Sequence, residues 1–141
     1  MINRIGTISI LGLLVLTSGY VNSAGDDFGL PGEAVLNEIE LKQLLSGKTV
    51  KGIYIDQNKS FARYYGKDGA VRQNIDKDTQ EGNWFIDKNG RRCIIWSGNK
   101  KNCRVVVKDN ELYKEFAVQK NNKPKLMVIY KKVVFGNPGD L

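Results

Sequence analysis

The chain of 141 residues contains no histidine, only two cysteines and only three prolines. Without histidine, Ser-His-Asp and Cys-His catalytic arrangements are excluded, and the commonest metal ligand is missing. Two cysteines cannot complete a tetrahedral zinc site unless carboxylates join them, and none lies close to them in sequence. No glycine-rich phosphate-binding motif is present either. We therefore expect no metal and no cofactor, and interpret the protein as non-enzymatic.

Residues 1–23 have the pattern of a secretory signal peptide. Arg4 supplies the positive charge, an uncharged apolar stretch follows, and small residues before position 24 suit cleavage. The alternative is a membrane anchor, but hydroxyl residues and glycines weaken the span of ~20 apolar residues that a bilayer needs. The sequence therefore predicts a periplasmic or secreted protein. Residues 24–35, rich in Gly, Pro and Asp, are predicted as a flexible leader, and residues 36–141 as a single β-rich domain.

Basic residues outnumber acidic residues by 22 to 15, and they are unevenly distributed. Residues 24–87 contain 8 basic and 11 acidic side chains, whereas residues 88–132 contain 13 basic and 3 acidic ones. This asymmetry predicts an electropositive face that favours an anionic partner. The alternative is that lysines on exposed strand faces only keep the protein soluble and protect the sheet edges.

One helix is predicted within residues 36–48. Asn37 is a suitable N-cap, and Glu40, three residues later, completes a capping box. Gly47 can adopt the left-handed conformation that ends a helix. About ten residues do not hold a helix alone in water, so the helix must pack on an apolar surface. The side chains predicted to make that contact are Ile39, Leu41, Leu44 and Leu45.

The rest of the chain is predicted to form eight short β-strands. Apolar or alternating runs are separated by turns that contain Gly, Asn or Asp, at short and regular intervals. Short connections favour antiparallel neighbours, because a parallel crossover needs about a dozen residues or more. The predicted fold is mainly β: an antiparallel up-and-down meander that forms a small barrel or a strongly curled sheet, with one N-terminal helix. The predicted strands are residues 49–55, 60–66, 69–75, 80–86, 91–97, 102–108, 111–119 and 125–135.

Both cysteines lie in the sequence RRCIIWSGNKKNC at residues 91–103. Cys93 and Cys103 are symmetric about Gly98, so a hairpin that turns there places them opposite each other. At a non-hydrogen-bonded antiparallel pair the Cα atoms are ~4.5 Å apart, near the short end of the range for a disulfide. An even cysteine count in an exported chain favours the same pairing. We predict a Cys93–Cys103 disulfide; the alternative is a pair of buried free thiols.

The same hairpin carries aromatic and cationic side chains that predict a binding tip for an anionic ligand or a partner protein. The predicted binding residues are Arg91, Arg92, Trp96, Lys100, Lys101 and Arg104. For Trp96 the alternative is a place in the core.

Carboxylates are numerous enough for a glycosidase-type mechanism, which requires two of them across a cleft. Most adjoin Gly, Asn or Lys at predicted turns, where Asp usually bonds its own backbone. The spacing of Asp76 and Asp78 does not fit a calcium loop, and Lys77 between them opposes a cation. These carboxylates are Asp56, Asp68, Asp76, Asp78, Glu81 and Asp87.

Five short pieces of sequence carry a resemblance to other proteins. They are LLSGKTVKG at 44–52, YYGKDG at 64–69, EGNWFID at 81–87, RCIIW at 92–96 with the later Cys103, and FGNPGDL at 135–141. In this order they resemble a group of small exported bacterial single-domain β-proteins of uncharacterised function. The resemblance implies an exported β-domain with a cysteine pair, and it implies no activity or ligand.

The leading hypothesis from the sequence is a binding protein for an anionic small molecule, an envelope component or a protein partner. The alternative is a protein inhibitor of an exported or foreign enzyme, because a stiffened hairpin lowers the cost of binding. A carboxylate-dependent hydrolase is the third hypothesis. We expect no specific nucleic-acid partner, no membrane span after signal cleavage, and a monomer.

Overall fold

A computed structural model describes residue 30 and residues 34–141. The predicted signal peptide and most of the predicted leader lie outside the described residues. Within the predicted leader, Leu30, Ala34 and Val35 are described, and Val35 is buried and forms an isolated antiparallel bridge with Val107. The described chain therefore packs onto the domain immediately before the first helix.

One short helix and eight strands follow in simple succession, which confirms the predicted mainly β fold. Every predicted strand is present, with its ends within two residues of the predicted ones. The elements are α1 (Glu38–Leu45), β1 (Lys48–Tyr54), β2 (Lys59–Tyr65), β3 (Ala70–Ile75), β4 (Asp78–Ile86), β5 (Arg92–Trp96), β6 (Lys100–Asp109), β7 (Leu112–Val118) and β8 (Pro124–Phe135).

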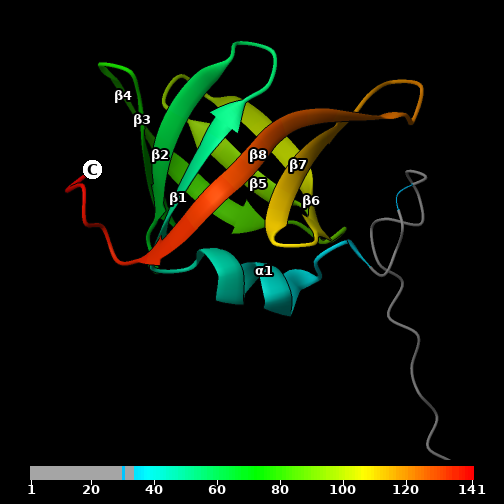
Figure 1. Cartoon of the computed structure of the whole chain (residues 1–141), viewed down its shortest axis with the longest axis horizontal. Helices are drawn as coiled ribbons and strands as arrows, with labels where there is room; N and C mark the ends of the chain where they lie inside the picture. Colours follow the sequence, from blue (N-terminus) through cyan, green and yellow to red (C-terminus); the bar gives the residue numbers. More distant parts are fainter. Residues whose placement is uncertain (1–29, 31–33) are drawn as a thin grey trace, which may run out of the picture.

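The eight strands close into an antiparallel barrel in sequence order (Figure 1). The closing contact is between β1 and β8, so neither strand has an unpaired edge. The register shifts between Lys51 and Gly52 in this pair, and a Cβ added at Gly52 would lie only 2.5 Å from the carbonyl oxygen of Ile129. A second register shift lies in β7 at Glu115/Phe116. Such irregularities bend strands, and here they accompany the curvature of a small barrel.

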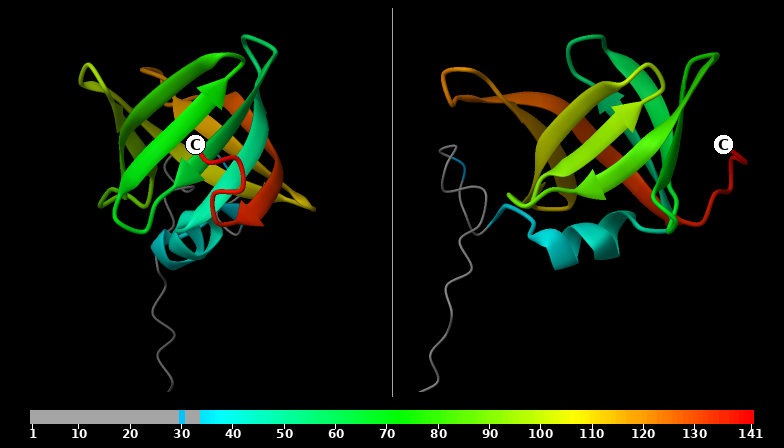
Figure 2. Two further views of the ribbon diagram at one scale, coloured as in Figure 1. Left: turned by 90° about the vertical axis from the view of Figure 1, so that its left-hand side faces the viewer. Right: turned by 180° about the vertical axis from the view of Figure 1, so that it is seen from behind.

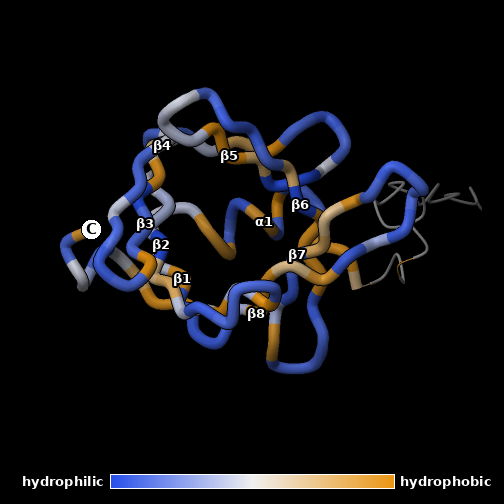
Figure 3. Tube along the Cα trace, turned by 90° about the horizontal axis from the view of Figure 1, so that it is seen from above, coloured by the Kyte–Doolittle hydropathy of each residue, from blue (hydrophilic) through white to orange (hydrophobic). Residues whose placement is uncertain are grey.

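Helix α1 covers one end of the barrel, as the view along the barrel shows (Figure 3). The predicted capping box is present: the Asn37 side chain accepts from the Glu40 backbone N–H, and the Glu40 carboxylate accepts from the Asn37 backbone N–H. Gly47 has a φ of +71°, as its predicted role at the helix end requires. Leu41 and Leu45 are fully buried, but Ile39 is 68% exposed. The predicted apolar face was therefore too wide, because α1 lies across the barrel end and buries a narrow stripe.

The apolar core occupies the end of the barrel that α1 covers. It joins the two helical leucines to inward side chains of the strands, among them Val50, Val71, Ile94 and Val106. Further along the barrel axis the buried side chains become polar and charged: Arg63, Gln73, Arg92 and Glu115. The barrel is thus apolar at its closed end and has a layer of buried polar and charged side chains below its other end.

Candidate functional site

The end of the barrel opposite α1 is open. The hairpin turns β1–β2, β3–β4, β5–β6 and β7–β8 project from this end (Figure 2). They surround a cavity of about 890 Å³, a size that suits a small molecule. Its lining includes Tyr54, Gln80, Trp96, Lys100, Asn102, Arg104 and Met127. We call this space the mouth cavity.

Beneath the mouth cavity, Glu115 of β7 holds together a network of buried charges. Its Oε1 lies 3.3 Å from Nη1 of Arg63 and its Oε2 accepts from Nη2 of Arg92. The Tyr130 hydroxyl donates to Oε1. All four side chains are almost completely buried. One carboxylate from β7 therefore neutralises guanidinium groups from β2 and β5 across the barrel interior.

Arg63 has a partner for each of its guanidinium nitrogens. Nε donates to Oε1 of Gln73 at 2.7 Å, Nη1 to the Tyr65 hydroxyl at 2.8 Å, and Nη2 to the Tyr54 hydroxyl at 2.6 Å. The guanidinium carbon also lies 5.8 Å from the ring centre of Trp96. These contacts fix Arg63 as structural support for the wall of the mouth cavity.

Charge is only partly balanced inside the barrel. Burial raises the pKa of Glu115, but the nearby Arg92 and Arg63 outweigh this effect and lower the pKa overall, so the carboxylate stays ionised. Arg104 of β6 lies directly opposite Arg92 of β5 in the strand register. Burial, together with the positive charge of Arg92, lowers the pKa of Arg104. In this described part of the interior, the three arginines Arg63, Arg92 and Arg104 therefore lie near one carboxylate, that of Glu115.

Comparison with known proteins does not assign this chain to a family. No family model matches the chain, and no curated protein is significantly similar to it. The resemblance of its sequence pieces to small exported β-proteins stays a prediction. In the part of the chain that the structure describes, no helix has the length and apolar composition needed to span a membrane.

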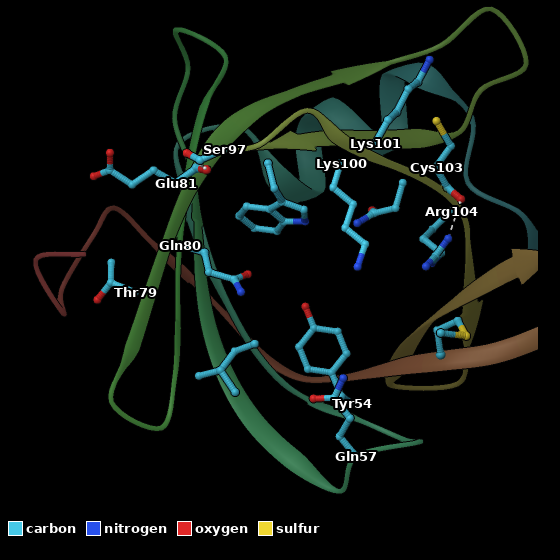
Figure 4. A pocket seen from close by; sticks show the side chains of 14 residues that line it. Tyr54, Gln57, Thr79, Gln80, Glu81, Ser97, Lys100, Lys101, Cys103 and Arg104 are labelled. Atoms are coloured by element: carbon cyan, nitrogen blue, oxygen red, sulfur yellow. Dashed lines mark hydrogen bonds between the residues drawn. The ribbon is translucent and has the colours of Figure 1, made fainter.

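The six predicted binding residues do not form one tip, because successive strand residues point to opposite sides of the sheet. The register pairs Arg92 with Arg104 and Trp96 with Lys100, and these four residues belong to the inner face. Trp96, Lys100 and Arg104 line the mouth cavity, whereas Arg92 lies buried below it. Figure 4 shows the side chains of Lys100 and Arg104 directed into the cavity.

The other two predicted residues, Arg91 and Lys101, lie on the outer side of the barrel wall. The Arg91 guanidinium forms an ion pair with Asp87 at 2.7 Å. Lys101 borders the cavity, but its side chain points away from it in Figure 4, and its ammonium lies 5.4 Å from the Phe85 ring centre. Alternation within the strands therefore divides the six predicted binding residues into four on the inner face and two on the outer side of the wall.

The predicted disulfide is present between Cys93 and Cys103, with Cα atoms 4.0 Å apart in directly opposed positions. Asp87 lies close enough that one ligand atom from each of the three residues falls within 4.8 Å of the others. Both sulfurs are already bonded to each other, and the Asp87 carboxylate accepts from the backbone and side chain of Arg91. This cluster therefore staples the hairpin in its oxidised form and offers no thiolate to a metal.

The carboxylates considered for catalysis lie at turns and on the surface. Asp68 accepts from the Ala70 backbone, while Asp56 and Asp76 pair with Lys125 and Lys59, respectively. Glu81 borders the mouth cavity, yet it points away from it in Figure 4 and lies 3.5 Å from the Arg72 guanidinium. These positions give the hydrolase hypothesis no support from geometry.

Sequence reasoning missed the polar interior, above all Arg63, Gln73 and Glu115. One signal was available for Arg63: it stands two residues from Phe61 and two from Tyr65, so all three share one strand face. A basic residue between two large apolar ones on the same face indicates a buried charge. Its partner on β7 is 52 residues away in sequence, and no local pattern connects the two.

Proposed function

We propose that this protein is an exported, non-enzymatic binding module that takes an anionic small molecule into the mouth cavity. The apolar stretch with cleavage signal at residues 1–23 and the Cys93–Cys103 disulfide support export to the periplasm or the medium. The mouth cavity supports the ligand class.

The observation that carries the proposal is the pair of cations directed into the mouth cavity. Arg104 uses only Nη1, which donates to the Cys103 carbonyl at 3.1 Å, and its Nε and Nη2 have no partner among the described residues. Lys100 likewise has no acidic partner in the described part of the chain. Arg104 also stands against the positive charge of Arg92. An anion bound at Arg104 would relieve this repulsion and supply charge-assisted hydrogen bonds.

The floor of the mouth cavity argues against a long apolar ligand. Barrels that enclose lipids need a deep apolar interior, whereas here the layer below the cavity consists of Arg63, Arg92 and Glu115. The apolar contribution to the cavity comes from its walls, where Trp96, Ile75 and Met127 lie. This combination favours a compact polar anion with some apolar surface.

The test is a calorimetric titration of the purified protein with citrate, using glycerol as a neutral comparison. We expect citrate binding that weakens at least tenfold when Arg104 is replaced by Gln, and that weakens with added salt. Lys101→Gln is the control, because it removes one positive charge from a neighbouring position on the outer side of the wall. Equal citrate affinity in Arg104→Gln and wild type would refute the proposal.

A second candidate function, inhibition of an enzyme, is favoured by one feature of the β5–β6 hairpin. Its turn residues Ser97, Gly98 and Asn99 are exposed, and the disulfide braces the strands behind them. A stiff exposed hairpin can insert into a cleft at little entropic cost. Inhibition of a purified lysozyme or protease that disappears when Gly98 and Asn99 are deleted, while the fold is retained, would support this function over the first.

A further inference from the structure

The hydrogen bonds around the mouth cavity have a direction that begins at the buried arginines. A guanidinium group donates hydrogen bonds and cannot accept them. Any amide bound to it must therefore present its oxygen to the arginine and turn its NH₂ group elsewhere. This rule assigns the orientation of several side-chain amides that line the cavity or lie behind it.

The first chain of hydrogen bonds starts at Arg63. Its Nε donates to Oε1 of Gln73 at 2.7 Å, so Nε2 of Gln73 must be the donor in the next contact. That contact is with Oε1 of Gln80 at 3.2 Å. Gln80 therefore turns its own NH₂ group outward, and its side chain reaches into the mouth cavity in Figure 4. The buried arginine thereby fixes the position of a hydrogen-bond donor on the cavity wall through two successive hydrogen bonds.

The second chain is shorter and starts at Arg92. Its Nη1 donates to Oδ1 of Asn102 at 2.9 Å, which leaves the NH₂ group of Asn102 without a partner among the described residues. Asn102 lines the cavity between Lys100 and Arg104 on the same face of β6. The Nε of Arg92 is itself buried and unpaired within the described chain. The inner face of β6 thus presents three donors in a row.

Several of the acceptors in and behind the cavity wall already accept hydrogen bonds. The oxygens of Gln73, Gln80 and Asn102 accept from the network, and the Tyr54 hydroxyl accepts from Arg63 while donating to Gln73. A neutral sugar would bring hydroxyl protons that need acceptors, and buried unpaired donors are costly. A ligand that consists largely of acceptors has no such cost.

The two cations stand four residues apart on β6, so their Cα atoms are about 13 Å apart along the strand. Side chains on one face of a strand stand roughly perpendicular to it, so each of the two cations can bind a carboxylate of its own without leaning toward the other. Resting on the proposed function, we infer that the mouth cavity recognises a compound with two separate carboxylate groups, one bound by Arg104 and the other by Lys100. The amide donors of Asn102 and Gln80 bind the oxygens that face the middle of the cavity.

The test compares matched ligands of one chain length: adipate with two carboxylates, hexanoate with one, and adipamide with none. Succinate and suberate extend the series to shorter and longer spacings. We expect the best dicarboxylate to bind the purified protein at least tenfold more tightly than hexanoate. Adipamide should show no binding at 10 mM, which limits its binding free energy to less than about 3 kcal/mol. Calorimetry at low ionic strength measures all five.

Two variants assign the second carboxylate and the donor row. Lys100→Gln should reduce dicarboxylate affinity to that of hexanoate and leave hexanoate unchanged, whereas Lys101→Gln should change neither. Asn102→Asp keeps an oxygen that can accept from Arg92. It replaces the NH₂ group that faces the cavity with a negatively charged oxygen, which accepts hydrogen bonds and cannot donate them. This variant should unfold at the same or a higher urea concentration than wild type and lose at least tenfold in dicarboxylate affinity.

The outcomes separate the two proposals. If hexanoate and every dicarboxylate bind equally well and all depend on Arg104, the anion-binding function stands and the two-carboxylate inference is wrong. If neither the acids nor citrate bind at 10 mM, both are wrong. If Asn102→Asp binds the dicarboxylate as well as wild type does, the role of the donor row is refuted.

Discussion

The sharpest prediction about stability concerns Glu115, which balances two buried arginines from opposite parts of the barrel. The substitution Glu115→Gln keeps the size of the side chain and one acceptor oxygen, but it removes the negative charge. Arg63 and Arg92 would then remain buried without a carboxylate. Removing one partner of a buried ion pair typically costs about 3–5 kcal/mol, because the remaining charge is left uncompensated. We expect a loss in this range, which is a large part of the stability of a small domain.

Urea unfolding at pH 7, followed by tryptophan fluorescence, measures this loss. With an m-value of about 1.5 kcal/mol/M, the midpoint should fall by about 2–3 M. Glu111→Gln is the matched control, since it makes the same charge change at an exposed position in the β6–β7 turn. It should alter the free energy of unfolding by less than about 0.5 kcal/mol.

Acid provides a second measurement for the same substitution. The pKa of Glu115 is lowered in the folded protein, so its contribution to stability is present above its unfolded pKa and is lost as the pH falls through the folded value. The stability difference between wild type and Glu115→Gln should therefore shrink below about pH 4. A difference under about 1 kcal/mol at pH 7, or one that stays constant in acid, would refute the reasoning about the buried network.

Four further variants test other parts of the fold by urea unfolding. The double variant Cys93→Ser/Cys103→Ser should lose about 3 kcal/mol, the entropy expected for a loop of this length, and wild type under reducing conditions should match it. Gly82→Ala should cost about 1–3 kcal/mol, because its Cβ would lie 2.3 Å from a carbonyl oxygen of β5. Gly139→Ala, whose Cβ would meet nothing closer than 3.8 Å, should be near neutral, and an equal effect of the two alanines would contradict the steric argument. Asn37→Ala should cost about 1 kcal/mol through loss of the helix cap, and no change would mean that the capping box contributes nothing.

Local features of this protein could be predicted from its sequence because they depend on neighbouring residues. The N-cap at Asn37 depends on Glu40 three positions later, and the strand limits depend on turn residues beside them. The pairing of Cys93 with Cys103 required only a short hairpin about Gly98. Interactions over such short separations leave a pattern in the chain itself.

The candidate site could be predicted only in part. The sequence marked the segment 91–104 as cationic and predicted its aromatic and basic residues as one binding tip. It did not show which face is the interior, since that depends on the closure of β1 against β8. The predicted single tip therefore became an inner set at the mouth cavity and an outer set on the wall.

Sequence alone determined the eight antiparallel strands, the capped helix, the disulfide and the uneven charge. Tertiary structure decided that the sheet closes, which side of each strand is buried, and that Glu115 meets Arg63 and Arg92 inside the barrel. The physical reason is the separation of the interacting residues along the sequence. Turns, caps and the alternation of side chains depend on residues a few positions apart. The polarity of the mouth cavity results from contacts between β2, β5 and β7, which come together only when the barrel is complete.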